Sequence, residues 1–306
     1  MQRPKRVTVA EMGPRDGLQN EHELVPTETK IAFIDMLSES GLPIVEATSF
    51  VSPKAIPQLA DGAEVYAAIR KRPGVRYPVL VPNMRGYERA RAVDVREIAV
   101  FTAASERFTE RNIRMSIAES IETFREVVRH AKADGLRVRG YVSTAFGSPF
   151  GDEVPPKDVV DVAVALADLG CDEISIGDTI GVGVPSQVEE LVPMLARRIP
   201  LERLAMHFHD TRGTALANVY AALGCGISIF DSSSGGLGGC PYAPGATGNL
   251  GTEDLLYLLH AMGIETGVDL DRLIECALMA EEIVGHPLPG KVMKGGSLSR
   301  YRSNKR

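Results

Sequence analysis

Two histidines lie one residue apart in the apolar stretch AMHFHD, which spans residues 205–210. The chain of 306 residues holds only 6 histidines, so this spacing needs an explanation. Side chains at positions i and i+2 of a β-strand point to the same face of the sheet. If the stretch is a strand, His207 and His209 converge on one point, and two converging imidazoles suit a divalent metal ion.

Further polar residues lie where other apolar runs end. Arg15 and Asp16 occupy the turn GPRDG, whereas Glu46 and Asp178 lie within apolar runs. A carboxylate in such a run is costly unless it is paired, so a functional site or a buried ion pair must account for both. Asp16 could add a carboxylate to the two imidazoles, and Asn249 could add a carbonyl oxygen.

This mixed nitrogen and oxygen set is compatible with Mg²⁺ or Mn²⁺, and also with Zn²⁺, Fe²⁺ or Co²⁺, because imidazole discriminates poorly among these ions. No thiolate is assigned to the metal, so we favour Mg²⁺ and Mn²⁺. Alternatives stay open for individual residues. Asp210 either orients His209 or caps the following helix, and Arg15 with Asp16 forms either part of the site or a surface ion pair.

The elements that must position these residues alternate along the chain. Short β-branched runs are separated by longer amphipathic segments, which is typical of parallel strands joined by helices. Eight such units fit between Val7 and about Gly239, so we predict an α/β fold, a (β/α)8 TIM barrel, rather than a doubly wound sheet. The predicted strands begin at residues 7, 44, 77, 97, 137, 173, 204 and 227. Active sites of this fold lie where strands end and the next loops begin.

The remainder of the chain predicts two added C-terminal helices, capped near Thr252 and Asp269. No Pro-, Gly- or Ser-rich linker divides the sequence. We therefore expect residues 1–306 to form a single catalytic domain, in which residues from about 252 to 306 are a helical extension and tail. A homodimer through the added helices is a further expectation.

Composition argues against several classes of protein. The chain has 34 Lys and Arg against 40 Asp and Glu, whereas a nucleic-acid partner would need a cationic surface. No apolar run approaches the roughly 18 residues that a membrane-spanning helix requires. The four cysteines show no CxxC spacing, so we expect reduced thiols and a cytoplasmic protein.

The Gly-rich segment SGGLGGCPYAPGATGN, residues 234–249, follows the eighth predicted strand. It lacks the GK[ST] ending of a phosphate-binding loop. We interpret it as a mobile lid in which the thiol of Cys240 donates or accepts a proton. The alternative is an incidental loop thiol.

Several motifs together resemble the 3-hydroxy-3-methylglutaryl-CoA lyases, a branch of the metallolyase barrels that also include isopropylmalate and homocitrate synthases. They are GPRDGLQNE, VEATSFVSPK, GDTIGVG, HFHDT with ALAN, and GLGGCPYAPGATGN, and the similarity runs from about Val7 to Gly267. The resemblance implies cleavage of an acyl-CoA substrate, (S)-3-hydroxy-3-methylglutaryl-CoA, to acetoacetate and acetyl-CoA. It also implies a divalent metal and a place in leucine degradation and ketone-body formation.

The resemblance further assigns roles to individual positions. The implied metal ligands are Asp16, His207, His209 and Asn249. The implied catalytic residues are Arg15, Glu46, Asp178, His207 and Cys240, with Gln19 and Thr179 at the substrate and Asp210 and Glu253 supporting the ligands. Asp178 with His207 would take the hydroxyl proton. Arg15 would face the developing enolate oxygen, Cys240 would help to reprotonate the enolate, and Glu46 would position Arg15 or join the proton network.

The sequence departs from the family motifs at Arg212, Thr214, Ser234 and Gly235, and residues 143–152 read STAFGSPFGD where SCALGCPYEG is usual. Arg212 either adds a cation near the acyl group or faces solvent, so the substrate could be another tertiary 3-hydroxyacyl-CoA. Two other functions stay open. One is a Claisen-type synthase that condenses acetyl-CoA with a 2-oxo acid, and the other is a barrel that binds CoA esters without turnover.

Overall fold

The computed structural model describes residues 3–239 and 248–297. Within them the strands form one parallel sheet in the order β2-β1-β9-β8-β7-β6-β5-β4-β3. The strands are β1 (Thr8–Glu11), β2 (Ile44–Val45), β3 (Thr48–Ser49), β4 (Val79–Leu80), β5 (Glu97–Ala103), β6 (Arg137–Ser143), β7 (Glu173–Asp178), β8 (Leu204–Phe208) and β9 (Ile229–Ser232).

The sheet closes because β2 and β3 are two pieces of one barrel strand. Between them, the Glu46 amide donates to the Glu11 carbonyl at 2.9 Å and the Ala47 amide donates to the Pro78 carbonyl at 3.0 Å. The two ends of the strand order therefore meet in one segment, and the predicted TIM barrel is confirmed. The third predicted strand is shorter than expected, because Pro78 and Pro82 have no N–H to donate to a ladder.

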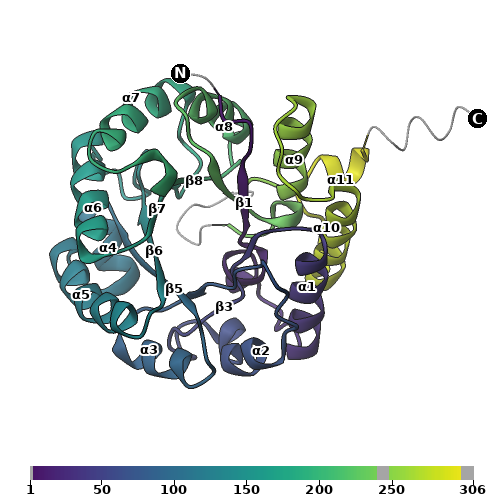
Figure 1. The fold of residues 1–306 in the computed structure, drawn as a ribbon, viewed down its shortest axis with the longest axis horizontal. Helices are drawn as coiled ribbons and strands as arrows, with labels where there is room; N and C mark the ends of the chain where they lie inside the picture. The colour runs from purple at the N-terminus through teal and green to yellow at the C-terminus, as the bar shows by residue number, and fades with distance from the viewer. Residues whose placement is uncertain (1–2, 240–247, 298–306) are drawn as a thin grey trace, which may run out of the picture.

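Helices surround the ring of strands, as Figure 1 shows along the barrel axis. Sequence signals explain several helix ends. The side chains of Ser116 and Glu119 form a capping box at the start of α5, and Gly170, at φ 107°, ends α6 in the left-handed conformation. The barrel helices are α1 (Thr27–Glu39), α2 (Gly62–Ala68), α3 (Met84–Arg91), α4 (Glu106–Ile113), α5 (Ile117–Ala133), α6 (Pro156–Leu169), α7 (Pro185–Ala196) and α8 (Ala215–Gly224).

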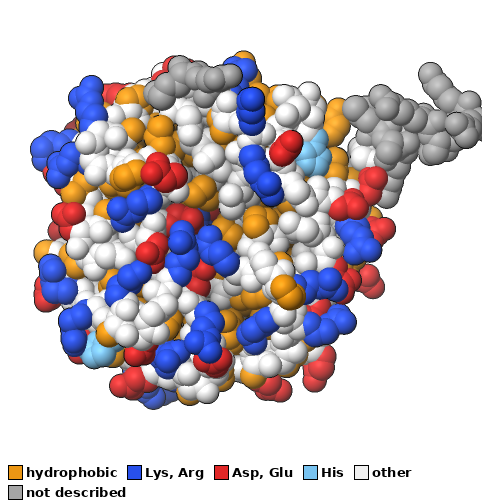
Figure 2. Space-filling view, viewed as in Figure 1, with side chains coloured by type: hydrophobic (Ala, Val, Ile, Leu, Met, Phe, Trp, Pro, Cys, Tyr) orange, Lys and Arg blue, Asp and Glu red, His pale blue; other side chains and the backbone are white. Residues whose placement is uncertain are grey.

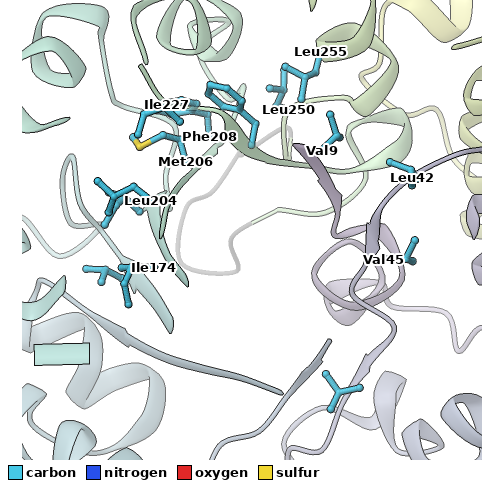
Figure 3. Packing of buried hydrophobic residues seen from close by; sticks show 14 of the residues in the cluster. Val9, Leu42, Val45, Ile174, Leu204, Met206, Phe208, Ile227, Leu250 and Leu255 are labelled. Carbon is cyan, nitrogen blue, oxygen red and sulfur yellow. The ribbon is translucent and has the colours of Figure 1, made fainter. Parts of the chain in front are cut away.

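Apolar side chains fill two layers. The larger layer lies between strands and helices, and Figure 3 shows part of it, including Met206 and Phe208. A smaller cluster that includes Ala10, Met12 and Tyr141 lies inside the barrel. Because side chains alternate along a strand, His207 faces the barrel interior while its neighbours Met206 and Phe208 face the helices.

The C-terminal segment packs on the barrel, with α9 (Thr252–Ala261) and α10 (Leu270–Val284) as predicted and a short α11 (Val292–Gly295) beyond them. Helix α10 lies beside α1, as Figure 1 shows. The next residues cover the turn η5 (Ser234–Gly236): the Gly290 amide donates to the Gly235 carbonyl at 2.8 Å. Gly235 has a φ of 69°, a left-handed conformation that favours glycine, and a Cβ atom there would lie 2.5 Å from Leu288 Cδ1.

No helix in the described part of the chain combines the length and the apolar character needed to cross a membrane. On the face drawn in Figure 2, Lys and Arg side chains are interspersed with Asp and Glu.

Candidate metal centre and active site

β8 and the turn after β1 bring three potential metal ligands together. The ring centroids of His207 and His209 are 5.2 Å apart. One ligand atom from each histidine and one from Asp16 all lie within 4.8 Å of one another. The strand geometry expected from the sequence thus produces a compact His–His–Asp group.

Asp16 reaches this group from a π-helical turn, η1 (Gly13–Gly17). The turn is tightly packed, because a Cβ atom on Gly13 would lie 2.6 Å from Glu11 Oε1. Asp16 Oδ1 accepts hydrogen bonds from Arg15 Nη1 at 2.7 Å and from Gln19 Nε2 at 3.0 Å. The carboxylate is therefore held in one orientation by its own turn.

Asn249 completes the group. Its Nδ2 donates to Asp16 Oδ2 and to the Leu237 carbonyl, each at 3.0 Å, which leaves Oδ1 buried and without a hydrogen-bond partner. His209 Nδ1 is also buried and unpartnered. A buried polar atom without a partner costs about 1–3 kcal/mol. A cation bound by these residues would satisfy both atoms, so the donor set fits a divalent metal.

Burial and neighbouring charges set the protonation states of Asp16 and His209. Burial alone would raise the pKa of Asp16, but the Arg15 guanidinium and the two histidines lower it to about 2. Burial and then His207 lower the pKa of His209 to about 4. Near neutral pH Asp16 is therefore ionised and His209 is neutral, which are the protonation states that metal ligands require.

Arg15 is held beside the metal group by two carboxylates. Its Nε and Nη2 atoms each lie 2.6 Å from Glu46 Oε2, and its Nη1 contacts Asp16. The Tyr141 hydroxyl donates to Glu46 Oε1 at 3.2 Å. Burial raises the pKa of Glu46 even though Arg15 opposes this. The ion pair with Glu46 thus holds the Arg15 guanidinium in place.

Asp178 and Thr179 do not join the metal group in this structure. Asp178 follows Ile176 on the outward side of β7, and its two carboxylate oxygens accept the amides of Val182 and Gly183, each at 2.9 Å. Thr179 Oγ1 accepts the Thr144 amide at 2.7 Å. Among the described residues, no hydrogen bond or ion pair links Asp178 to His207. Both side chains hold the loop between β7 and α7.

We expect Asp178→Asn to lower the free energy of unfolding by about 1–3 kcal/mol, because an amide offers one acceptor oxygen to two backbone donors. The affinity for Mn²⁺ should stay at the wild-type value. Urea unfolding and calorimetric titration measure the two quantities. Turnover that stays at the wild-type value would contradict the proton-transfer role that the resemblance implies for this residue.

Asp210 and Arg212 bind backbone groups near the loop. Asp210 Oδ1 accepts the Ala215 amide at 3.0 Å, so the side chain stabilises the start of α8, and Lys291 Nζ lies 2.8 Å from Oδ2. Arg212 Nη1 donates to the carbonyls of Ile180 at 2.8 Å and Gly181 at 3.0 Å. Of the two interpretations of Asp210, these contacts favour the helix cap.

Glu253 is buried at the start of α9, behind the loop that carries Asn249. Its Oε2 accepts the Gly235 amide at 3.0 Å, whereas Oε1 has no partner among the described residues. Burial, with the neighbouring carboxylate of Asp254, raises the pKa of Glu253 to about 8. The carboxyl group is therefore largely protonated at neutral pH.

This pKa predicts a pH dependence of stability. A carboxyl group whose pKa is about 8 when folded, against a model value of 4.5, binds more protons in the folded state, so stability falls as pH rises between these values. We expect Glu253→Gln to remove a decline on the order of 2 kcal/mol between pH 6 and pH 8.5. Urea unfolding of the metal-free protein at both pH values measures it. Parallel pH profiles for the variant and the wild type would contradict the assignment.

Comparison with known proteins agrees with this geometry. A family model described as HMGL-like matches residues 6–279. The chain belongs to the HMGL-like family. Hydroxymethylglutaryl-CoA lyase of Bos taurus, named as mitochondrial, is 55% identical to it over 272 residues, which cover 89% of this chain and 84% of the bovine protein.

Solved structures resemble the HMGL-like chain closely. Hydroxymethylglutaryl-CoA lyase from Pseudomonas aeruginosa matches with a TM-score of 0.94 and 49% identity, over 96% of this chain and 98% of that one. An HMG-CoA lyase from Acinetobacter baumannii, solved with coenzyme A and 3-methylmalate, matches with a TM-score of 0.93 and 40% identity over 96% of each chain.

Sequence reasoning missed several buried charges of this HMGL-like barrel, among them Glu11, Asp231 and Arg139. Glu11 accepts hydrogen bonds from the amides of Gly13 and Ser234 and from the Thr252 hydroxyl, so it joins η1 to η5 and α9. Asp231 and Arg139 each occupy a position of their strand that faces the barrel interior. The alternation of side chains along the two strands was the sequence signal that could have identified them. Cys240 lies outside the described residues.

Proposed function

We propose that the protein cleaves (S)-3-hydroxy-3-methylglutaryl-CoA to acetoacetate and acetyl-CoA with a bound divalent cation. The observation that carries this proposal is the joint placement of Asp16, His207, His209 and Asn249 in a chain that belongs to the HMGL-like family. The donor set favours Mg²⁺ or Mn²⁺. Binding of coenzyme A in the Acinetobacter baumannii relative supports an acyl-CoA substrate.

The reaction removes the proton of the tertiary hydroxyl, and the electron pair of the O–H bond forms the π bond of the new ketone at C3. The electron pair of the broken C2–C3 bond forms the thioester enolate, which is then protonated at C2. A divalent cation at the site supplies Lewis acidity that lowers the pKa of that hydroxyl. Arg15, fixed by Glu46, presents its positive charge to the thioester oxygen, where negative charge develops as the enolate forms. Gln19 is held at the same rim through Asp16.

Proton transfer is assigned from the resemblance. Burial raises the pKa of Asp178, which brings the residue closer to the range of a general base. Both of its oxygens bind loop amides here, so the loop after β7 would have to rearrange for Asp178 to accept the hydroxyl proton with His207. Cys240 would return a proton to C2 of the enolate and yield acetyl-CoA.

The proposal also includes a single domain, a homodimer and a cytoplasmic location, as expected from the sequence. The contacts of Leu288 and Lys291 with the barrel support a single domain that includes the C-terminal extension. Tyr257 and Leu278, which are 36% and 43% exposed on α9 and α10, support a homodimer through these helices. The free thiols of Cys171, Cys225 and Cys276 suit a cytoplasmic location.

The test is turnover by the purified protein. We expect acetoacetate to form from (S)-3-hydroxy-3-methylglutaryl-CoA with Mg²⁺ or Mn²⁺ and not with excess chelator. A panel of other tertiary 3-hydroxyacyl-CoA esters defines the acyl group. Failure to cleave any of these esters would overturn the proposal, and release of free CoA from acetyl-CoA with a 2-oxo acid would indicate a synthase instead.

A further inference from the structure

A row of buried charges lies inside the barrel, beneath His207. His207 Nδ1 lies 3.3 Å from Asp231 Oδ2, and the other oxygen of Asp231 accepts a hydrogen bond from Arg139 Nη2 at 2.5 Å. Arg139 Nε in turn lies 2.8 Å from Glu173 Oε1. The side chains of Asp231, Arg139 and Glu173 are at most 2% exposed, so this row is part of the barrel interior.

The row continues to the opposite end of the barrel. Arg76 and Arg137, which are 33% and 42% exposed, lie near Glu173 at 3.9 and 3.5 Å. Both also pair with Glu97. Charges of alternating sign therefore connect the partly exposed N-terminal ends of the strands to the metal group at their C-terminal ends.

In the part of the chain that the structure describes, each hydrogen-bond partner of Asp231 is a donor. Arg139 donates to Oδ1, and the Ser175 hydroxyl donates to Oδ2 at 2.8 Å. The Arg139 guanidinium carries a fixed positive charge beside Oδ1, so Asp231 is a hydrogen-bond acceptor at both oxygens. The nitrogen of His207 that faces it must then carry the proton, and Nε2, which lies 4.0 Å from Asp16 Oδ2, is left with its lone pair toward the metal group.

We propose that Asp231, fixed by Arg139 and Ser175, is a positioning residue that holds His207 in the tautomer and ring orientation needed to bind the metal. This inference rests on the proposed function only in taking the His–His–Asp group as the metal centre. Carboxylate partners of metal-binding histidines act in this way in general, and their loss typically costs 10–100-fold in affinity.

Asp231→Asn tests the proposal with almost no change in shape. If Oδ1 stays on Arg139, the new NH₂ group faces Ser175 and His207, and the imidazole must accept a hydrogen bond at Nδ1. We expect histidine ¹⁵N NMR of the metal-free protein in alkaline buffer to show the Nδ1–H tautomer of His207 in the wild type and the Nε2–H tautomer in the variant. The Kd for Mn²⁺, measured by calorimetry, should rise about 10–100-fold.

Asp35→Asn is the matched control. Asp35 is also a buried carboxylate, and it binds Arg70 at 2.7 Å outside the site. This variant should keep the wild-type tautomer and Kd. An Nε2–H tautomer of His207 in the wild type would overturn the proposal, and this measurement does not depend on whether a variant folds. A Kd for Mn²⁺ within about twofold of the wild-type value in Asp231→Asn would also overturn it. Neither measurement uses an acyl-CoA, so absence of lyase activity would leave both readouts intact.

Discussion

Replacing His209 with alanine is expected to weaken the binding of Mg²⁺ or Mn²⁺ by at least about 100-fold, because loss of outer partners of a ligand alone costs 10–100-fold. His209 contributes one of three ligand atoms that lie within 4.8 Å of one another, and its Nδ1 is buried without a partner. Removing the ring therefore deletes a donor while leaving the rest of the barrel in place. Turnover at a fixed low metal concentration should fall by a similar factor.

Thermal unfolding with and without metal gives a readout separate from activity. A ligand that binds only the folded state raises the melting temperature, so the wild type should gain stability from added Mn²⁺ and His209→Ala should gain almost none. His130→Ala, on α5, is the control for the same change away from the site. Wild-type metal stabilisation in His209→Ala would remove this residue from the ligand set.

The second large effect is expected for Arg15→Gln, which should lower kcat about 10²–10³-fold. Arg15 is 6% exposed, and its guanidinium joins two carboxylates, Glu46 and Asp16, at 2.6 and 2.7 Å. Its loss removes the positive charge assigned to the enolate oxygen. It also leaves the Glu46 carboxylate buried without its cation, and breaking a buried pair typically costs about 3–5 kcal/mol.

A double variant separates these two consequences. Arg15→Gln with Glu46→Gln no longer buries an unpaired Glu46 carboxylate, while Asp16 keeps its hydrogen bonds from Gln19 and Asn249. Most of the lost free energy of unfolding should therefore return while kcat stays low. Urea unfolding and steady-state kinetics measure the two quantities. If kcat recovers together with stability, Arg15 acts on the fold and not on the reaction.

The barrel could be predicted from the sequence because each strand carries its own local signal. Runs such as EIAVFT and EISIGDT are short, β-branched and followed by amphipathic segments, and the structure places strands at both. The convergence of His207 and His209 follows from the same alternation. These inferences depend only on the two-residue period of a strand.

Contacts between distant segments could not be predicted in this way. Asp178 ends a strand as His207 nearly does, and its carboxylate accepts the amides of Val182 and Gly183. The local sequence pattern does not show how the loop after β7 folds back onto this side chain. Asp231 was missed because a single acid before a serine run carries no local sign that Arg139 lies across the barrel.

The hydrogen bond between Asn249 and Asp16 joins residues 233 positions apart, and this separation has a consequence for biosynthesis. Chains emerge from the ribosome with the N-terminal end first, so the first metal-binding residue is made long before the last. A nascent chain can pair its early strands, yet the proposed cation site stays incomplete until Asn249 has been made. Capture of the proposed metal should therefore follow synthesis of all the barrel strands.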